Sequence, residues 1–141
     1  MIKKIRYSLF LALTLAILPM AIAAAEEEPK TFYSVSYSGA MVLNKTIEIG
    51  IDHRGVKLEA ITFSGDEALV VTWNRTPSGV KAHAAIALFD AKNQLVGAES
   101  DSRATSIRSG KQGNFKIRFK KFLSDFSGVA RFQVVFVIVE S

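Results

Sequence analysis

The sequence of residues 31–141 predicts a single all-β domain in which antiparallel strands pack as a sandwich. Three observations lead to this prediction. Apolar residues alternate with polar ones through most of the region, which is the period of a half-buried strand. Turn-forming residues interrupt the alternation at short, regular intervals. No segment of any length after residue 30 has the apolar repeat of a helix.

Residues 1–25 have the three parts of a cleavable export signal. Three cations within residues 3–6 precede an apolar run from residue 9 to residue 18. Pro19 then ends the helical segment, because proline lacks the backbone N–H and clashes with the preceding turn. Three alanines at 23–25 supply the small–any–small pattern of a cleavage site, with Ala21-Ile22-Ala23 as a second option, and we expect cleavage after Ala25.

A retained membrane anchor is the alternative, since residues 5–25 nearly reach the roughly 20 apolar residues that a spanning helix needs. The proline, the alanine-rich tail and the acidic start of residues 26–30 favour cleavage, with 26–30 as a disordered leader. No cysteine follows the apolar run, which excludes a lipid anchor. We therefore expect a protein of the periplasm or cell surface with no stable membrane span after cleavage.

Charge and cysteine content narrow the class of protein. The chain has 18 Lys+Arg and 13 Asp+Glu, a formal net charge of +5, but three of the cations lie in the signal. The mature chain therefore has 15 cations against 13 acids, and this small excess, outside the cytoplasm, predicts no nucleic-acid partner. The chain has no cysteine, so a domain of about 116 residues must rely on packing alone, which suits a bacterial envelope protein.

The predicted strands of the first half span residues 33–38, 43–51, 56–63 and 68–75. Asp52-His53-Arg54-Gly55 joins the second to the third as a tight turn, because Asp can bond its own backbone and Gly can take a positive φ. Ser64-Gly65-Asp66 ends the third strand. In the fourth strand, Leu69, Val71 and Trp73 share one face.

The predicted strands of the second half span residues 80–89, 94–99, 105–108, 114–120 and 130–140. Thr76-Pro77-Ser78-Gly79 and Asp90-Ala91-Lys92-Asn93 predict turns before and after the first of these. Residues 122–126 are expected to form one helical turn over an open end. Seven to nine strands in about 110 residues are typical of an immunoglobulin-like antiparallel β-sandwich.

Three segments share a pattern of strand ends and turns: Val71-Thr72-Trp73-Asn74-Arg75-Thr76, Ile86-Ala87-Leu88-Phe89-Asp90 and Ile107-Arg108-Ser109-Gly110-Lys111. Together they resemble the FxLYD-type domains of bacterial exported proteins, an immunoglobulin-like group. The second segment matches the naming motif with Ile for Phe and Phe for Tyr, and Ser109 stands where proline is usual. The resemblance covers roughly residues 68–119. It implies the fold and an envelope setting, and the group has no shared catalytic site.

Side chains for catalysis are sparse. The sequence has no Gly-x-Ser-x-Gly motif and no thiol. His53 is expected to be a solvated turn residue, and His83 shares an outward face with Ala85 and Ala87. No metal-ligand motif occurs, and no cofactor is expected. The prediction is a protein that is not an enzyme; the alternative is a hydrolase that uses His83 with a nearby carboxylate.

Six cations form a candidate surface for an anionic partner: Arg108, Lys111, Lys116, Arg118, Lys120 and Lys121. Lys116, Arg118 and Lys120 alternate with apolar residues, so they project from one strand face about 7 Å apart. Such a row could meet a polyanion. The alternative is an ordinary solvated face, or an edge strand that lysines protect from aggregation.

The last predicted strand is apolar on both faces over its distal half. Its even-numbered residues from Phe132 to Ile138 are expected to face the core, while the opposite face carries the candidate interaction residues Val135, Val137 and Val139. Either the chain covers these valines itself, through residues 122–126 or its first strand, or they offer a patch or edge to a partner.

These features predict an exported, non-enzymatic β-sandwich protein of the bacterial cell envelope. We expect it to bind an envelope protein or an anionic envelope polymer through a sheet face or edge. The alternative is a structural subunit that self-associates through its C-terminal strand into a homo-oligomer.

Overall fold

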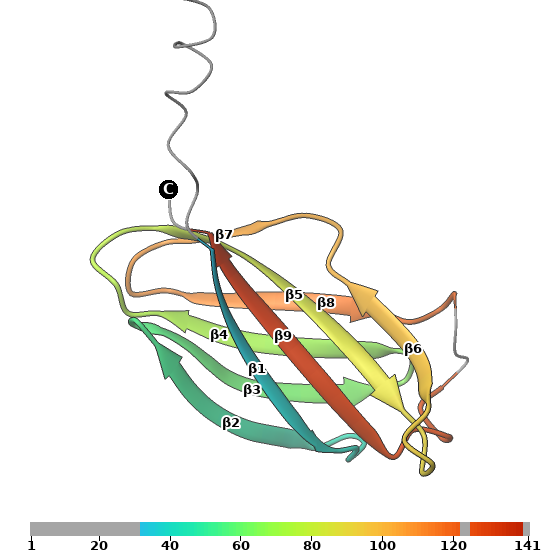
Figure 1. Cartoon of the computed structure of the whole chain (residues 1–141). Helices are drawn as coiled ribbons and strands as arrows, with labels where there is room; N and C mark the ends of the chain where they lie inside the picture. Colours follow the sequence, from blue (N-terminus) through green and yellow to red (C-terminus); the bar gives the residue numbers. More distant parts are fainter. Residues whose placement is uncertain (1–31, 122–124, 140–141) are drawn as a thin grey trace, which may run out of the picture. The chain divides into compact units, whose positions relative to one another are not determined.

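The computed structural model describes residues 32–121 and 125–139, which form two antiparallel β-sheets (Figure 1). In chain order the strands are β1 (Phe32–Ala40), β2 (Thr46–His53), β3 (Val56–Ser64), β4 (Glu67–Asn74), β5 (Val80–Phe89), β6 (Leu95–Ser100), β7 (Thr105–Ile107), β8 (Gln112–Arg118) and β9 (Arg131–Val139). Sheet A has the order β1-β9-β5-β6, with β7 also pairing β5, and sheet B has the order β2-β3-β4-β8. The predicted all-β sandwich of antiparallel strands is confirmed.

Several sequence predictions fall outside the described residues. These are the export signal, the leader at 26–30 and residues 122–124 of the predicted helical turn. Within the described ranges, no helix has the length and apolarity that a membrane span requires.

The order of the strands shows how the chain divides itself between the two sheets. The meander β2-β3-β4 builds most of sheet B, the next three strands extend sheet A, and β8 returns to sheet B beside β4. The chain then ends in β9, which is inserted between β1 and β5. An immunoglobulin constant domain places strands A, B, E and D in one sheet and C, F and G in the other. The likeness to that group is therefore one of two-sheet architecture, and the strand order differs.

The turn between β2 and β3 forms as its residues predict. The Gly55 backbone N–H donates a 3.0 Å hydrogen bond to Oδ1 of Asp52. Arg54 and Gly55 both have positive φ, 51° and 86°, which is the pattern of a type I′ hairpin turn. The His53 side chain differs from the expectation of a solvated turn residue. It is half-buried, with its ring centroid 5.7 Å from that of Tyr33, because Tyr33 and Arg54 enclose this corner through a 3.9 Å cation–π contact.

Phenylalanine rings fill the space between the sheets. Phe63 of β3 lies 4.9 Å from Phe132 of β9, centroid to centroid, so the two sheets meet directly. Phe126, which precedes β9, packs edge-on against both Phe63 and Phe119 at 5.4 and 5.5 Å. These aromatic contacts hold the two sheets together in a chain that has no cysteine and therefore no disulfide.

Hydrogen bonds from the Ser127 side chain and backbone N–H hold the turn around Phe126 and lower the pKa of Asp125.

The inward face of β4 carries its smaller and more polar residues. Ala68, Val70, Thr72 and Asn74 are buried, whereas Leu69, Val71 and Trp73 share the outer face and are half-buried there. The two polar residues can be buried because both are paired. Thr72 Oγ1 donates to the Gly113 carbonyl oxygen at 3.1 Å, and the Asn74 amide donates to two carbonyl oxygens.

Asn74 ties together two of the three segments that carry the sequence resemblance. Its Nδ2 donates to the carbonyl oxygens of Ser78 at 2.8 Å and Ile107 at 2.9 Å. Its Oδ1 accepts from the Thr76 backbone N–H and hydroxyl at 2.9 and 2.6 Å. The Ser109 hydroxyl completes the link by donating to the Thr76 carbonyl oxygen. The Asn-x-Thr turn and the segment 107–111 are thus one hydrogen-bonded unit.

Candidate docking face

The outer face of sheet A carries mainly small and apolar side chains. It consists of the side chains that alternate away from the core on four strands: Phe32, Ser34, Ser36, Ser38 and Ala40; Arg131, Gln133, Val135, Val137 and Val139; Lys81, His83, Ala85, Ala87 and Phe89; Leu95, Ala98 and Ser100. We call this set the docking face. None of its members is an acid; Glu99 of β6 borders the face but alternates to the other side of that strand, opposite Ile86.

The three candidate valines lie in the middle of the docking face. Val135 faces Ser36 of β1 on one side and Ala85 of β5 on the other, and Val137 lies between Ser34 and His83. Because β9 is paired along both sides, its valines can reach a partner only through the face and not through an edge. Phe126 does not cover them, since it is buried in the core between the sheets, and β1 lies beside β9 in the same sheet.

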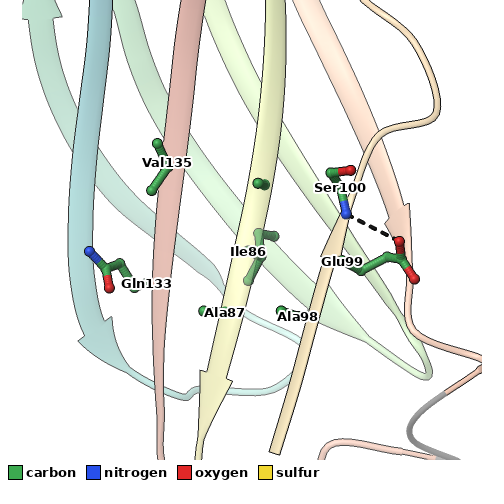
Figure 2. A pocket seen from close by; sticks show the side chains of 8 residues that line it. Ile86, Ala87, Ala98, Glu99, Ser100, Gln133 and Val135 are labelled. Atoms are coloured by element: carbon green, nitrogen blue, oxygen red, sulfur yellow. Dashed lines mark hydrogen bonds between the residues drawn. The ribbon is translucent and has the colours of Figure 1, made fainter. Parts of the chain in front are cut away.

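A shallow depression of about 400 Å³ lies in the docking face, over β5, β6 and β9 (Figure 2). Its lining residues are Ala85, Ile86, Ala87, Ala98, Glu99, Ser100, Gln133 and Val135. Ala87 has Ala98 as one register partner and Gln133 as the other. The methyl side chains of the alanines end close to the backbone, so the surface drops between their longer neighbours.

Cationic and aromatic residues bound one end of the docking face. The Arg131 guanidinium lies 4.2 Å over the Phe89 ring, and its Nη2 donates to Asn93 Oδ1 at 2.6 Å. Lys81 marks the other end, eight residues away from Phe89 along β5 or about 26 Å. Between these ends the face carries small, apolar and polar side chains, and its two strong cations lie one at each end.

Asp101 hydrogen-bonds to the backbone of β5 at the one place along that edge where no strand pairs with it among the described residues. β6 ends at Ser100 and β7 begins at Thr105, so the middle of β5 lacks a neighbouring strand there. The Ala84 backbone N–H donates to Asp101 Oδ1 at 3.0 Å, and the Asp101 N–H donates to the Ala84 carbonyl oxygen at 3.1 Å. The carboxylate thus supplies the acceptor that a regular strand would have supplied.

The structure brings His83 next to this carboxylate, as the hydrolase alternative requires. His83 Nδ1 lies 3.6 Å from Asp101 Oδ1, and the Asp101 side chain is only 9% exposed. Oδ1 is already used by the Ala84 N–H, and Oδ2 is buried without a hydrogen-bond partner among the described residues. In the same part of the chain, no hydroxyl is hydrogen-bonded to His83, and no group of three or more His, Cys, Asp or Glu could hold a metal ion. The pair has an evident structural use in closing the edge of β5.

The outer face of sheet B is chemically different. Its charged members are Glu48, Asp52, Lys57, Glu59, Glu67, Lys116 and Arg118, and between them β4 contributes the larger apolar side chains of Leu69, Val71 and Trp73. Lys57 lies 3.7 Å from Glu59, and Arg118 Nε lies 3.1 Å from Glu67 Oε2. This arrangement is typical of a solvated sheet face.

The six candidate cations follow β8 from one end to the other. Arg108 and Lys111 lie in the turn before the strand, Lys116 and Arg118 project from it, and Lys120 and Lys121 follow it; all six are exposed. β8 is the edge strand of sheet B. The cations therefore lie on an edge strand, where lysines protect a sheet from pairing with another chain. One of them, Arg118, already pairs with Glu67.

Reasoning from the sequence identified the valines and the outward direction of His83, Ala85 and Ala87. It did not connect them with Ala98, Ser100 and Gln133, which the register places beside them. The sequence feature that could have connected them is the scarcity of charged residues on the outward sides of β5, β6 and β9. Nothing in the polar segment 100–113 pointed to Asp101, since its partner Ala84 is recognised through the backbone alone.

No protein-family model and no curated protein matches the chain.

Proposed function

We propose that the chain is an exported, non-enzymatic β-sandwich protein of the bacterial cell envelope that binds another envelope protein through the docking face. One observation carries the proposal: the two outer faces of the sandwich differ in charge. Sheet B presents acids and bases on β2, β3, β4 and β8, two pairs of them in contact, beside the apolar outer side of β4, whereas the side chains that define the docking face include no acid and only two strong cations, one at each end. A sheet face that evolved only for solvation would carry charges along its length.

The chemistry of the face indicates the partner. Val135, Val137 and the alanines around the depression favour apolar side chains, because burying apolar surface drives association. Lys81 and Arg131 favour carboxylates on both sides of that apolar patch. The fitting partner is thus a protein surface with an apolar centre and an acidic rim. The export signal and the FxLYD-type resemblance in the sequence support the envelope setting.

The test is capture from envelope extract with three immobilised forms of the protein. Val135→Glu places a charge beside the depression on the internal strand β9. Thr62→Glu is the matched control, because Thr62 is also half-buried on the outer side of an internal strand, in sheet B. We expect the wild-type protein and Thr62→Glu to retain the same partner in quantitative mass spectrometry, and Val135→Glu to lose most of it. Equal capture by all three folded forms would refute the proposal.

The row of cations on β8 is tested in the same experiment. Replacing Lys116, Arg118 and Lys120 with serine leaves the docking face unchanged, so capture of a protein partner should persist. Loss of capture in that variant, with capture kept in Val135→Glu, would assign binding to β8 and to an anionic polymer instead.

A further inference from the structure

The turns at one end of the sandwich carry cations from three separate parts of the chain. Arg54 lies in the turn between β2 and β3, Arg75 in the turn between β4 and β5, and Arg108 and Lys111 in the turn between β7 and β8. These turns lie at the same end of the two sheets (Figure 1), and all four side chains are exposed. We call these four residues the basic end.

Backbone hydrogen bonds join the three turns to one another. The Arg75 N–H donates to the Gly55 carbonyl oxygen at 2.7 Å, which joins the first turn to the second. The Asn74 N–H donates to the Lys111 carbonyl oxygen at 2.9 Å, and the Gly110 N–H donates to the Asn74 carbonyl oxygen at 2.7 Å, which joins the second to the third. Because segments bonded in this way lie about 5 Å apart, the backbones of the four cations lie within about 15 Å of one another. The fold thus brings together cations that are far apart in the sequence.

The charge of the basic end is not balanced by nearby acids of the described chain. The three turns contain no acid, and none of the four cations forms a salt bridge with another described residue. Arg54 lies over the neutral ring of Tyr33, which leaves its charge in place. The acids at 26–28 and Glu140 lie outside the described residues. At the opposite end, the turns carry acids as well as cations: Asp66, Asp90 and Asp125 beside Lys45, Lys92, Lys120 and Lys121.

The backbone donors of these turns are already used within the chain. The N–H groups of Gly55, Arg75, Thr76, Gly110 and Lys111 all donate to other groups of the protein. A site for a single phosphate ion is typically built from such N–H groups converging on the ligand. Here an anion would meet the cationic side chains alone. Cations on separate, mutually bonded turns suit a surface that presents many phosphates, each of which a guanidinium can bind through two N–H groups.

We propose that the basic end binds the anionic headgroups of a membrane surface, so that the domain contacts the membrane with its turns. A linear polymer would instead fit a row of cations such as that along β8. The chain also enters the domain at this end, since Phe32 and Lys81 are both register partners of Val139. The predicted export signal is therefore joined to the basic end through residues 26–31. The docking face lies along the strands, so this inference does not rest on the function proposed for it.

The test is cosedimentation of the exported protein, without its signal, with phosphatidylcholine vesicles that contain about one third phosphatidylglycerol. We expect binding at about 0.05 M salt and release at about 0.5 M, because salt screens the attraction. Vesicles of phosphatidylcholine alone should not bind. The double variant Arg75→Gln with Arg108→Gln should bind about twentyfold more weakly, since each cation near an anionic surface contributes about fivefold.

The matched control is Lys45→Gln with Lys92→Gln, which removes the same charge from exposed residues at the opposite end. These lysines lie about a strand length of 25 Å away, beyond the screening distance, so the control should bind vesicles like the wild-type protein. Circular dichroism shows whether both double variants are folded. Val135→Glu should also bind vesicles normally, which separates this surface from the docking face.

An equal loss of binding in both double variants would overturn the proposal, because net charge rather than the basic end would then be responsible. Failure to bind anionic vesicles would overturn it as well. So would binding to soluble polyphosphate that anionic vesicles do not displace, which would assign the cations to a polymer.

Discussion

The side-chain amide of Asn74 donates a 2.9 Å hydrogen bond to the carbonyl oxygen of Ile107, which lies 33 residues further along the chain. Asn74 is fully buried, and all the hydrogen-bonding capacity of its amide is used, since Nδ2 also donates to Ser78 and Oδ1 accepts twice from Thr76. One side chain therefore fastens the end of β4 to the end of β7 and to the turn between β4 and β5.

Asn74→Ala should destabilise the protein by about 2–4 kcal/mol, because it removes the side-chain donor of the buried Ile107 carbonyl oxygen and the acceptor of the Thr76 backbone N–H. Urea unfolding followed by circular dichroism measures the change. Asn114→Ala is the control, since Asn114 is exposed on β8 and its side chain accepts a 3.0 Å hydrogen bond from the exposed Gln112, and we expect less than about 0.5 kcal/mol there. Similar values for the two variants would contradict the structural importance of Asn74.

Gly113 of β8 packs closely against the Ile107 side chain at the end of β7. A Cβ atom at this position would come 2.5 Å from Ile107 Cδ1 and 3.0 Å from Thr72 Oγ1. Gly113→Ala should therefore destabilise by about 1–3 kcal/mol through overpacking. Gly128→Ala, where no atom lies within 4 Å, should be neutral or slightly stabilising because alanine restricts the unfolded chain. Thermal denaturation of the two variants provides the comparison, and a loss of stability in the second alone would be inconsistent with the packing described.

Phe126 joins Phe63 of β3 to Phe119, which follows β8. Phe126→Ala should remove about 3–5 kcal/mol of stability, since the ring is buried and its neighbours cannot close the cavity fully. Leu95→Ala removes a side chain that is 62% exposed and should change stability by less than about 0.5 kcal/mol. Guanidinium unfolding measures both. If Phe126→Ala were as mild as Leu95→Ala, the ring would not belong to the core.

The contact between Arg118 and Glu67 should contribute little to stability, because the Arg118 side chain is 65% exposed and its charge is screened by water. A double-mutant cycle with Arg118→Ala and Glu67→Ala should give a coupling free energy below about 1 kcal/mol, which falls further at high salt. A larger, salt-insensitive coupling would mean that the row of cations on β8 has a structural task beyond protecting the edge.

The strands could be predicted from the sequence because alternation is a local property. The predicted bounds 80–89 coincide with β5, and the turn at residues 52–55 follows from the residue types that accept positive φ. The cations of β8 were also predicted to project, because Phe115 and Ile117 between them had to face a core.

Alternation determines that a strand has two faces, but neither which face is buried nor which strands become neighbours. In β4 the larger side chains of Leu69, Val71 and Trp73 face outward, since Thr72 and Asn74 find their partners in segments 107–113. The distal half of β9 was likewise predicted to be apolar on both sides and to offer either a face or an edge to a partner. Only its pairing with both β1 and β5 decided that its valines belong to a face. The sequence by itself thus determined the elements and their turns, which depend on neighbouring residues. The tertiary structure decided the faces and edges, which depend on hydrogen bonds and packing between residues far apart in the chain.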